Sequence, residues 1–549
     1  MFAIAILIGI YSYLIFTLGI LGLLYKATIL ICTLIFLFCA IFYFRKQKDD
    51  LPRINFRNKK IKPLLIFFGI LAFVNLIGAL SPELSFDSLW YHLTLPKIFL
   101  QNHSITYIPG GLFYYSVMPK LGEMFYILPV SLGLEIIPKL TQWGSGILTS
   151  FVIFKISRRH FDGKTSFFAV LIFYGSLVVA WESTVAYIDL IRTFFEVMAL
   201  WGILVYLETR NRKWLIESAV MLGLAISTKL IAFGSVLVFS AIIIYISSFK
   251  KITIKHTITN ILVYWCVALF IALPWFVFAL INTGNPFYPI FSNLYPVGLS
   301  WSSLNPVNSI RDLIILFFRA ADPISPIYII FLPLVFIYFK KFNKELKIIS
   351  IYSLLALIIW YLTPRTGGGR FILPYLPAFS ILAAGVIANT KIVWLKKYLT
   401  GLVIVVCLIT IMYRGIANSK FIPVIVGLQP KQEFLTNKLN FNFGDFYDTD
   451  GFFKQNIKST DRILLYGFHN LYYADFPFIH ESFVRKGDKF NYIATQNAEL
   501  PDRFKYWNLI YYNSITRVNV YSMKGEVWFI EISFSFVFYY FCIRRNIKA

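Results

Sequence analysis

The sequence predicts an all-α polytopic membrane protein with about 13–14 transmembrane helices and a small α/β domain near the C-terminus. Of the 549 residues, 58% are hydrophobic and only 14% are charged, whereas soluble domains carry about 25% charged residues. The apolar residues form runs of roughly 20, which is the length of a helix that crosses a bilayer. The short connections are basic at every second turn, as expected when Lys and Arg collect on the cytoplasmic side.

The net charge of +25 does not indicate binding to nucleic acid. A nucleic-acid surface gathers its Lys and Arg on one face or stripe, but here they stand in short clusters between apolar runs. The five cysteines all lie inside such runs and show no metal-ligand spacing. The N-terminus lacks the basic start and short apolar core of a cleaved signal peptide. We therefore expect the first apolar run to be retained as a span.

The first spans are predicted at 3–24 and 28–44, and the basic loop 45–62 with eight Lys or Arg follows them. This loop should be cytoplasmic, so residues 1–62 form an accessory N-terminal part and the span 63–80 leads to the outer side. Further spans are predicted at 136–156, 166–181, 188–207, 214–228, 231–248, 259–281, 324–339, 348–363, 372–390 and 399–413. The outer side then receives 81–135, 182–187, 282–323, 364–371 and the chain from about 414 onward.

The region 414–526 is polar and is predicted to form a small extracytoplasmic α/β domain. It contains two short β-type runs, Arg462–Gly467 and Trp507–Tyr512, between turn-forming residues. The last part, 527–549, holds an apolar run at 527–543 and a basic tail. This run is a possible last span, but it is short and contains Glu531, so an interfacial helix stays open.

The first outer loop, 81–135, carries more charges and helix breakers than an uninterrupted membrane helix could hold. A polar residue at membrane depth costs about 2.5–3.5 kcal/mol and therefore marks a site. The candidates in this loop are Asp87, Tyr91, His92, Lys120 and Glu123.

Three more groups of charged residues lie at the outer ends of predicted spans. Asp189 and Arg192 stand three positions apart on one helix face, Lys229 interrupts two apolar runs, and Arg365 and Arg370 flank a triple glycine. Carboxylates beside cations at one membrane face suit a lipid-linked phosphate substrate. The cations would neutralise the phosphate while a carboxylate serves as base.

Six motifs in order carry a resemblance to a known family. They are FDSLWYHL, PKLGEMFY, YIDL, GLAISTK, TGNPFYP and RFILPYLP. Together, over about 63–390, the chain resembles the GT-C membrane glycosyltransferases, in the bacterial branch similar to aminoarabinose transferase and the protein O-mannosyltransferases. The chain departs from that family in two places. Ser88 stands where several members carry a second acid, and two spans instead of one precede the span that leads into the loop.

The resemblance implies a GT-C transmembrane catalytic module over 63–413, with its active site on the outer face of the plasma (inner) membrane. It implies sugar transfer, with inversion, from a polyprenyl-phosphate donor to a glycan, lipid or protein acceptor. The implied catalytic residues are Asp87 as base, Glu123 and Asp189. Of the substrate-binding candidates, the resemblance implies Lys229 and Arg370. The residues themselves add Lys120, Arg365, His92 and Tyr91. No cofactor is required, and a divalent metal ion at Glu123 and Asp189 stays open.

Each candidate also has a structural interpretation. Asp87 could cap a helix beginning at Ser88, and Glu123 could be a solvated loop acid. Asp189 and Arg192 could form a structural pair, and Lys229 could snorkel to the interface. At helical spacing His92 lies off the face of Asp87, which favours a structural role. The aromatic side chains of the loop could form a belt at the membrane interface; they are Trp90, Tyr91, Tyr114 and Tyr115.

Two other functions compete with sugar transfer. A transporter or flippase of lipid-linked sugars would place its charges midway along broken helices with repeat symmetry. A polysaccharide polymerase or ligase would place its site in a late outer loop. The charges of this chain gather at one face and in the first outer loop, which favours the transferase.

Overall fold

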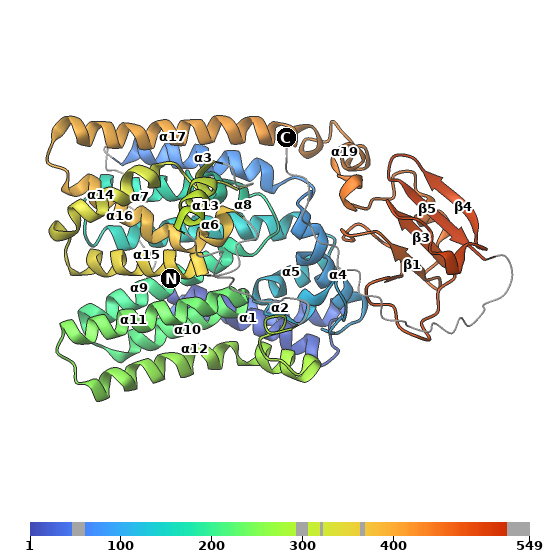
Figure 1. Cartoon of the computed structure of the whole chain (residues 1–549), viewed down its shortest axis with the longest axis horizontal. Helices are drawn as coiled ribbons and strands as arrows, with labels where there is room; N and C mark the ends of the chain where they lie inside the picture. Colours follow the sequence, from blue (N-terminus) through green and yellow to red (C-terminus); the bar gives the residue numbers. More distant parts are fainter. Residues whose placement is uncertain (47–60, 293–305, 319–321, 363–367, 524–549) are drawn as a thin grey trace. The chain divides into compact units, whose positions relative to one another are not determined.

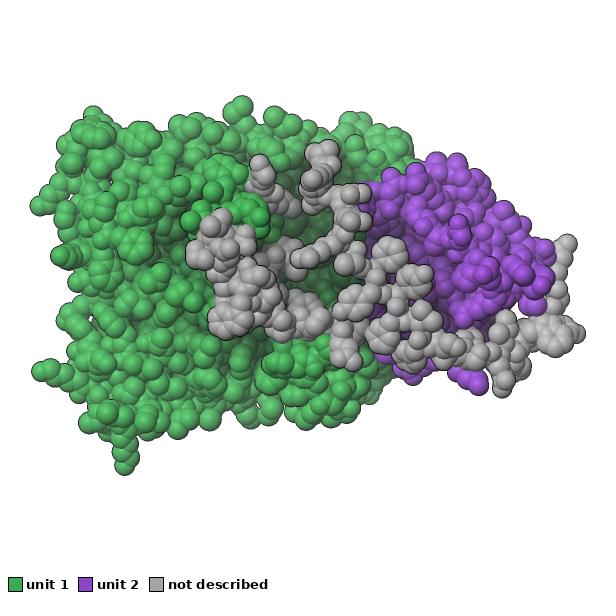
Figure 2. Space-filling model, in the orientation of Figure 1, with its two compact units in different colours: residues 1–108, 113–439 green, residues 109–112, 440–549 purple. Residues whose placement is uncertain are grey.

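The structure is a computed structural model that describes residues 1–46, 61–292, 306–318, 322–362 and 368–523. It divides into two compact units, coloured green and purple in Figure 2. Unit 1 holds Met1–Ile108 and Phe113–Leu439, and unit 2 holds Pro109–Leu112 and the chain from Asn440 onward. The predicted last span, 527–543, lies outside the described residues.

Unit 1 is a helical bundle (Figure 1). Its long helices are α1 (Phe2–Ile20), α2 (Lys26–Lys46), α3 (Lys62–Ala79), α6 (Ile136–Ser157), α7 (Gly163–Tyr174), α9 (Asp189–Thr209), α10 (Arg212–Thr228), α11 (Gly234–Phe249), α12 (Ile254–Thr283), α13 (Pro306–Phe318), α14 (Ile327–Tyr338), α15 (Lys344–Leu362), α16 (Leu376–Asn389) and α17 (Val393–Ser419). The short elements are η1 (Ser88–His92), α4 (Thr94–Gln101), η2 (Tyr114–Val117), α5 (Leu121–Ser131), α8 (Leu177–Glu182), η3 (Leu230–Phe233), η5 (Phe339–Lys341), η6 (Gly369–Phe371), η7 (Leu373–Tyr375), α18 (Ile422–Ile425) and α19 (Lys431–Lys438).

The prediction of a helical multi-pass membrane protein is confirmed. Within the described residues, eight helices are long and apolar enough to cross a membrane. The predicted count of about 13–14 is higher. Helices α6, α10 and α14 also lack the length or composition of a full span, 527–543 lies outside the described residues, and two further differences have local causes. The predicted span 166–181 is broken at Gly175 into α7 and α8, and α16 covers only part of 372–390. Both segments are apolar but too short to count as full spans.

Helix α9 forms the centre of unit 1. Its most apolar stretch is 89% buried, whereas that of α2 is only 11% buried. Helix α9 packs against α6 and α10, and α10 also packs against α12. The close approach of α10 to α12 depends on Gly223, where a Cβ would stand 2.7 Å from the carbonyl oxygen of Ala268. Small residues at such contacts let membrane helices pack through their backbones.

Helix α13 was not predicted, because it falls in the segment 282–323 that the charge pattern assigns to an outer connection. It starts at Pro306, a residue that suits the first helical turn. Its apolar side chains Ile310, Leu313 and Ile314 are exposed and repeat at helical spacing. A short amphipathic helix of this kind shows no span-length apolar run, so a search for spans does not find it.

The turn between α1 and α2 pairs with the first outer loop. The backbone N–H of Leu24 donates to the carbonyl of His103 at 3.0 Å, and that of Ile105 donates to Gly19 at 3.0 Å. Both connections therefore lie at the same end of the bundle. This is the arrangement that the alternation of basic connections predicts.

Unit 2 contains a five-stranded sheet with the order β2-β1-β3-β5-β4. The strands are β1 (Ile463–Tyr466), β2 (Phe478–His480), β3 (Tyr492–Gln496), β4 (Asn508–Asn513) and β5 (Val518–Ser522), and the helical turns of the unit are η8 (Phe441–Phe443), α20 (Phe452–Asn456) and η9 (Asp502–Phe504). β2, β1 and β3 are parallel, and β5 pairs antiparallel with β3 and β4. The predicted small C-terminal sheet domain is thereby confirmed, with β1 and β4 at the two predicted β-type runs.

Candidate active site

Asp87 stands at the start of a π-helical turn, η1, in the first outer loop. The turn is closed by a bond from the N–H of Leu93 to the carbonyl of Ser88, five residues earlier, at 2.9 Å. Such turns are rare and often occur at functional sites. The side chain of Asp87 caps no backbone N–H, so the capping interpretation does not hold. Instead, the Tyr91 hydroxyl donates to Asp87 Oδ2 at 3.3 Å.

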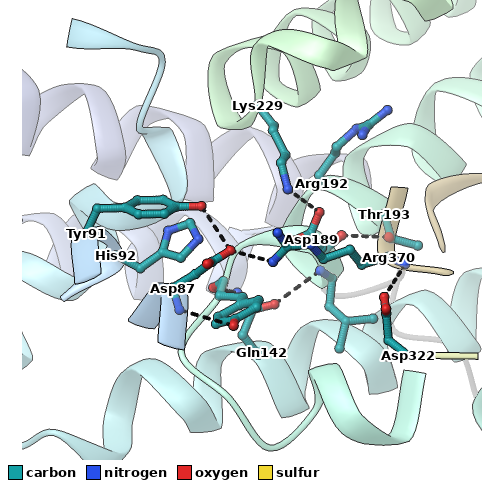
Figure 3. A network of polar contacts seen from close by, with 12 residues as sticks. Asp87, Tyr91, His92, Gln142, Asp189, Arg192, Thr193, Lys229, Asp322 and Arg370 are labelled. Atoms are coloured by element: carbon teal, nitrogen blue, oxygen red, sulfur yellow. Dashed lines mark hydrogen bonds and ion pairs between the residues drawn. The ribbon is translucent and has the colours of Figure 1, made fainter. Parts of the chain in front are cut away.

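Arg370 is the charged partner of Asp87, although 283 positions separate the two residues. Its Nη1 lies 2.5 Å from Asp87 Oδ2 (Figure 3). The backbone N–H of Arg370 donates to Asp322 Oδ2 at 2.6 Å, which holds η6 in place. Burial alone would lower the pKa of the Arg370 guanidinium, but Asp87 and the other acidic groups around it together raise that pKa. Arg370 therefore stays charged.

A second ion pair, between Asp189 and Lys229, lies in the same network (Figure 3). Asp189 begins α9 and is fully buried, and its Oδ1 accepts from Lys229 Nζ at 2.7 Å. Lys229 follows the last residue of α10 and keeps 17% of its side chain exposed. The pair rules out simple snorkelling of Lys229. Among the described residues, the buried Asp189 Oδ2 has no hydrogen-bond partner.

The two cations of the network surround one aromatic ring. Lys229 Nζ lies 5.0 Å from the centroid of Phe371, and the Arg370 guanidinium carbon lies 5.3 Å from the same centroid. Cations at this distance from a ring face are attracted by its quadrupole. The ring thereby lies against both positive charges, of which Arg370 pairs with Asp87 and Lys229 with Asp189.

Glu123 is buried and belongs to a separate cluster. Its Oε1 accepts from His92 Nδ1 at 2.9 Å and lies 3.5 Å from Lys120 Nζ. All three side chains are at most 3% exposed, so Glu123 is not a solvated loop acid. His92 directly follows Tyr91, which contacts Asp87. Through His92, the last residue of the π-helical turn, the buried cluster therefore supports that turn.

Arg192 does not pair with Asp189, although the two share a helix face. Its Nη2 approaches the hydroxyl of Tyr375 at 3.5 Å, and its side chain is 1% exposed. Figure 3 shows the guanidinium pointing away from Asp189. The interpretation of the two as a structural pair is therefore wrong, because Arg192 is directed toward Tyr375 and Asp189 pairs with Lys229.

The aromatic residues of the loop form a stack within the protein. The rings of Tyr91 and Tyr115 lie 4.2 Å apart at 11°, and those of Tyr114 and Tyr115 lie 4.0 Å apart at 29°. Trp90 meets Tyr115 edge-on at 5.0 Å. The interpretation as an interfacial belt is wrong for Tyr91, which is 7% exposed.

Glu83 joins the two outer loops and was missed as a site residue. Its Oε1 accepts from the N–H groups of Leu84 and Ser85, and its Oε2 accepts from Ala186 N–H at 2.7 Å. Buried Lys139 donates to the carbonyl and hydroxyl of neighbouring Ser81, each at 2.9 Å. The signal in the sequence was weak, because an acid near a loop start most often faces water.

We predict that Glu83→Gln destabilises the protein. The new amide presents N–H hydrogens where the carboxylate accepted backbone N–H groups, and each unsatisfied buried donor costs about 1–3 kcal/mol. Thermal unfolding of the purified variant in detergent should show a midpoint several degrees below that of the wild type. Glu208→Gln, at a 63% exposed acid, serves as control and should unfold with the wild type. An unchanged midpoint for Glu83→Gln would contradict the anchoring role.

Two further acids of the network were also missed. Glu182 is fully buried at the end of α8, and neither of its oxygens has a partner among the described residues. Burial and the nearby charge of Asp189 raise the pKa of Glu182 well above its usual range. Burial likewise raises the pKa of Asp322 to about 6, although the Arg370 backbone bond opposes the change.

The raised pKa of Asp322 predicts a pH-dependent stability. The folded state binds the proton of Asp322 more tightly than the unfolded state, so the free energy of unfolding falls as pH rises from 3.8, the ordinary value, to about 6. Above that pH the loss is complete. Asp322→Asn removes the titration and keeps an oxygen for the Arg370 N–H. Unfolding midpoints of both proteins are measured from pH 4.5 to 7.5. The midpoint of the variant should rise relative to that of the wild type up to about pH 6 and then keep a constant difference. A difference between the two midpoints that is the same at every pH would contradict the raised pKa of Asp322.

One predicted site residue is not described by the structure, and the open metal site receives no support from the geometry. Arg365 lies outside the described residues. Within the part of the chain that the structure describes, no group of three or more His, Cys, Asp or Glu residues could hold a metal ion. Glu123 and Asp189 stand in different clusters with different basic partners. They do not form a common metal site.

Comparisons with known proteins agree with the helical architecture. Residues 140–278 match the model of the family described as dolichyl-phosphate-mannose-protein mannosyltransferase. No sequence among the curated proteins matches the chain. The fold is similar to that of ArnT from Cupriavidus metallidurans bound to undecaprenyl phosphate, with a TM-score of 0.51, 13% identity and coverage of 84% of this chain and 98% of ArnT. The apo state of ArnT gives a TM-score of 0.50, 12% identity and coverage of 83% and 97%.

Proposed function

We propose, on the premise that the chain has the GT-C fold of membrane glycosyltransferases, that it moves a sugar from a polyprenyl-phosphate donor to an acceptor hydroxyl. The observation that carries the proposal is the buried carboxylate of Asp87 beside Arg370 and the Asp189–Lys229 pair. A base and two cations at one place are what this transfer needs. The matching family is that of dolichyl-phosphate-mannose-protein mannosyltransferases, and ArnT binds undecaprenyl phosphate, which together support a lipid-phosphate donor.

Asp87 would act as the general base. The acceptor oxygen attacks the anomeric carbon while the bond from that carbon to the phosphate oxygen breaks, which inverts the configuration. The acceptor proton passes to Asp87, and the bonding electrons leave with the lipid phosphate. Tyr91 and Arg370 both contact Oδ2, so Oδ1 is the oxygen proposed to take the proton. A positioned base contributes about 10²–10⁴-fold to such a step.

Arg370 and Lys229 would stabilise the departing phosphate. Both are held at one aromatic ring, and both are already oriented by carboxylates before a ligand binds. Preoriented charges in a poorly hydrated site lose little energy to reorganisation when the phosphate leaves. Glu123, His92 and Lys120 are proposed to position the loop that carries Asp87. They do not contact the reacting groups in this proposal.

The active site is proposed to face the extracytoplasmic side of the plasma (inner) membrane. Asp189 begins α9, and the basic residues Arg210 and Arg212 stand at its other end. A helix of 21 residues is about 31 Å long, which is the thickness of the hydrocarbon core. Because basic connections stay on the cytoplasmic side, the opposite end with Asp87 faces outward.

The proposal is tested with purified full-length protein in liposomes that contain a polyprenyl-phosphate sugar. A membrane extract supplies acceptors, and free polyprenyl phosphate is measured over time. Release of polyprenyl phosphate together with glycosylated product is expected. Movement of the intact donor across the bilayer without bond cleavage would refute the transferase and favour a transporter. Repeated addition of sugars to one acceptor, which gives longer glycan chains, would favour the polymerase.

A further inference from the structure

A pocket of about 530 Å³ in unit 2 lies outside the site described above. Its residues come from the carboxyl ends of the three parallel strands. Gly467 follows β1, Glu481 follows β2, and Asn497 follows β3. In open α/β sheets, ligands bind in the crevice outside the carboxyl ends of the strands. The volume is also in the range of small-ligand pockets, roughly 300–1,000 Å³.

The polar walls of this strand-end pocket are held by the backbone. His480 Nε2 lies 2.9 Å from the carbonyl of Phe468 and must donate to it, so Nδ1 accepts from the N–H of Ser482 at 3.1 Å. Glu481 Oε1 accepts from the N–H of Gly467 at 2.9 Å. The amide of Asn497 donates to the carbonyl of Phe441 at 2.7 Å. The pocket is therefore formed before a ligand arrives, which lowers the entropic cost of binding.

The tip of the first outer loop forms one wall of the same pocket. Pro109–Leu112 belongs to unit 2, and Gly111 and Leu112 line the pocket. Gly110 has a φ of +93°, and a Cβ there would stand 1.8 Å from the carbonyl oxygen of Ser482. Only glycine allows this approach. The loop that carries Asp87 thus also contributes to the strand-end pocket.

The lining residues identify the class of ligand. None of the described lining residues is Lys or Arg, so a phosphate or nucleotide would meet no cation. The polar groups are amide, imidazole, hydroxyl and carboxylate, which suit a neutral molecule with many hydroxyls. Phe443 lines the pocket and is 68% exposed, which offers an apolar surface. A pyranose ring has both an apolar face of C–H groups and a rim of hydroxyls.

We infer that the strand-end pocket binds a carbohydrate, which is the glycan part of the acceptor. The acceptor role rests on the proposed function, whereas carbohydrate binding stands without it. A peptide chain fits the pocket less well, because its alternating backbone groups need an open strand edge or long groove. The first outer loop would then contribute both to the pocket that binds the acceptor and, through Asp87, to catalysis.

Binding is measured by saturation-transfer-difference NMR on the purified full chain in a detergent without a sugar headgroup. The probes are glucose, galactose, mannose, N-acetylglucosamine and arabinose, with triglycine and inorganic phosphate for comparison. Saturation transfer to the ring protons of at least one sugar is expected. Phe443→Ala should weaken sugar binding about fivefold, as expected for one aromatic contact. Gly111→Trp, at a position with nothing within 4 Å of a Cβ, should fill the pocket and abolish the transfer.

Tyr506→Ala is the matched control, because Tyr506 is an 81% exposed aromatic residue of unit 2 outside the pocket. It should bind sugar like the wild type. Absence of transfer to every sugar, equal transfer in Gly111→Trp, or transfer to triglycine alone would each overturn the inference. Release of polyprenyl phosphate is measured in parallel on the wild type. Sugar binding without release refutes the proposed function alone, and release without sugar binding refutes the carbohydrate site alone.

Discussion

Asp87→Asn should lower the rate of sugar transfer by about 10²–10⁴-fold, the range for loss of a positioned base. The amide cannot take the acceptor proton, but its oxygen can still accept from Arg370 and Tyr91, which now contact Oδ2. The site geometry is therefore kept while the base is removed. The measurement is the initial rate of polyprenyl phosphate release by purified protein with a membrane extract as acceptor source.

Glu208→Gln is the control for this experiment. Glu208 is exposed and pairs with Arg159 at the end of α9 that lies far from Asp189. The control should transfer sugar at the wild-type rate. A folded Asp87→Asn protein with a rate within a factor of about three of the wild type would remove Asp87 as base, since so small a loss is below the range of base catalysis.

Arg370→Gln should lower the rate by about 10²–10³-fold, the usual loss when one group that stabilises developing charge is removed. The variant takes away a cation beside the departing phosphate and also the charged partner of Asp87. Removing one member of a buried pair leaves the other charge uncompensated, so the unfolding temperature should fall as well. The rate is therefore measured below the unfolding temperature of the variant.

The double variant Asp87→Asn/Arg370→Gln separates a shared role from two independent ones. Residues in contact couple in such cycles, and catalytic groups that act as a unit are far from additive. We expect the double variant to lose much less than the product of the two single losses. Arg159→Gln is the control, since Arg159 also pairs with two acids, Glu208 and Glu345, but away from the site. Strict multiplication of the single losses would contradict a joint role.

The helical architecture follows from the sequence alone, because the energy of placing a residue in lipid depends on the residue itself. Predicted spans and observed helices agree closely, as for 188–207 with Asp189–Thr209 and 348–363 with Lys344–Leu362. The predicted resemblance agrees with the family match over residues 140–278 and with the fold that the chain shares with ArnT. The short amphipathic helix Pro306–Phe318 was not predicted, since its pattern resembles that of a helix in a surface loop.

The sequence by itself also determined which residues are candidates: charged side chains at one end of apolar helices, including Asp87, Lys229 and Arg370. Only the tertiary structure decided their partners. Hydropathy and helical spacing describe neighbours within a few turns, whereas the Asp87–Arg370 pair spans 283 positions. Spacing at 3.6 residues per turn did place His92 off the Asp87 face, and the structure agrees: His92 pairs with Glu123, whereas Tyr91 contacts Asp87. Partner choice depends on which buried charges the packed helices bring together, and that is a property of the whole fold.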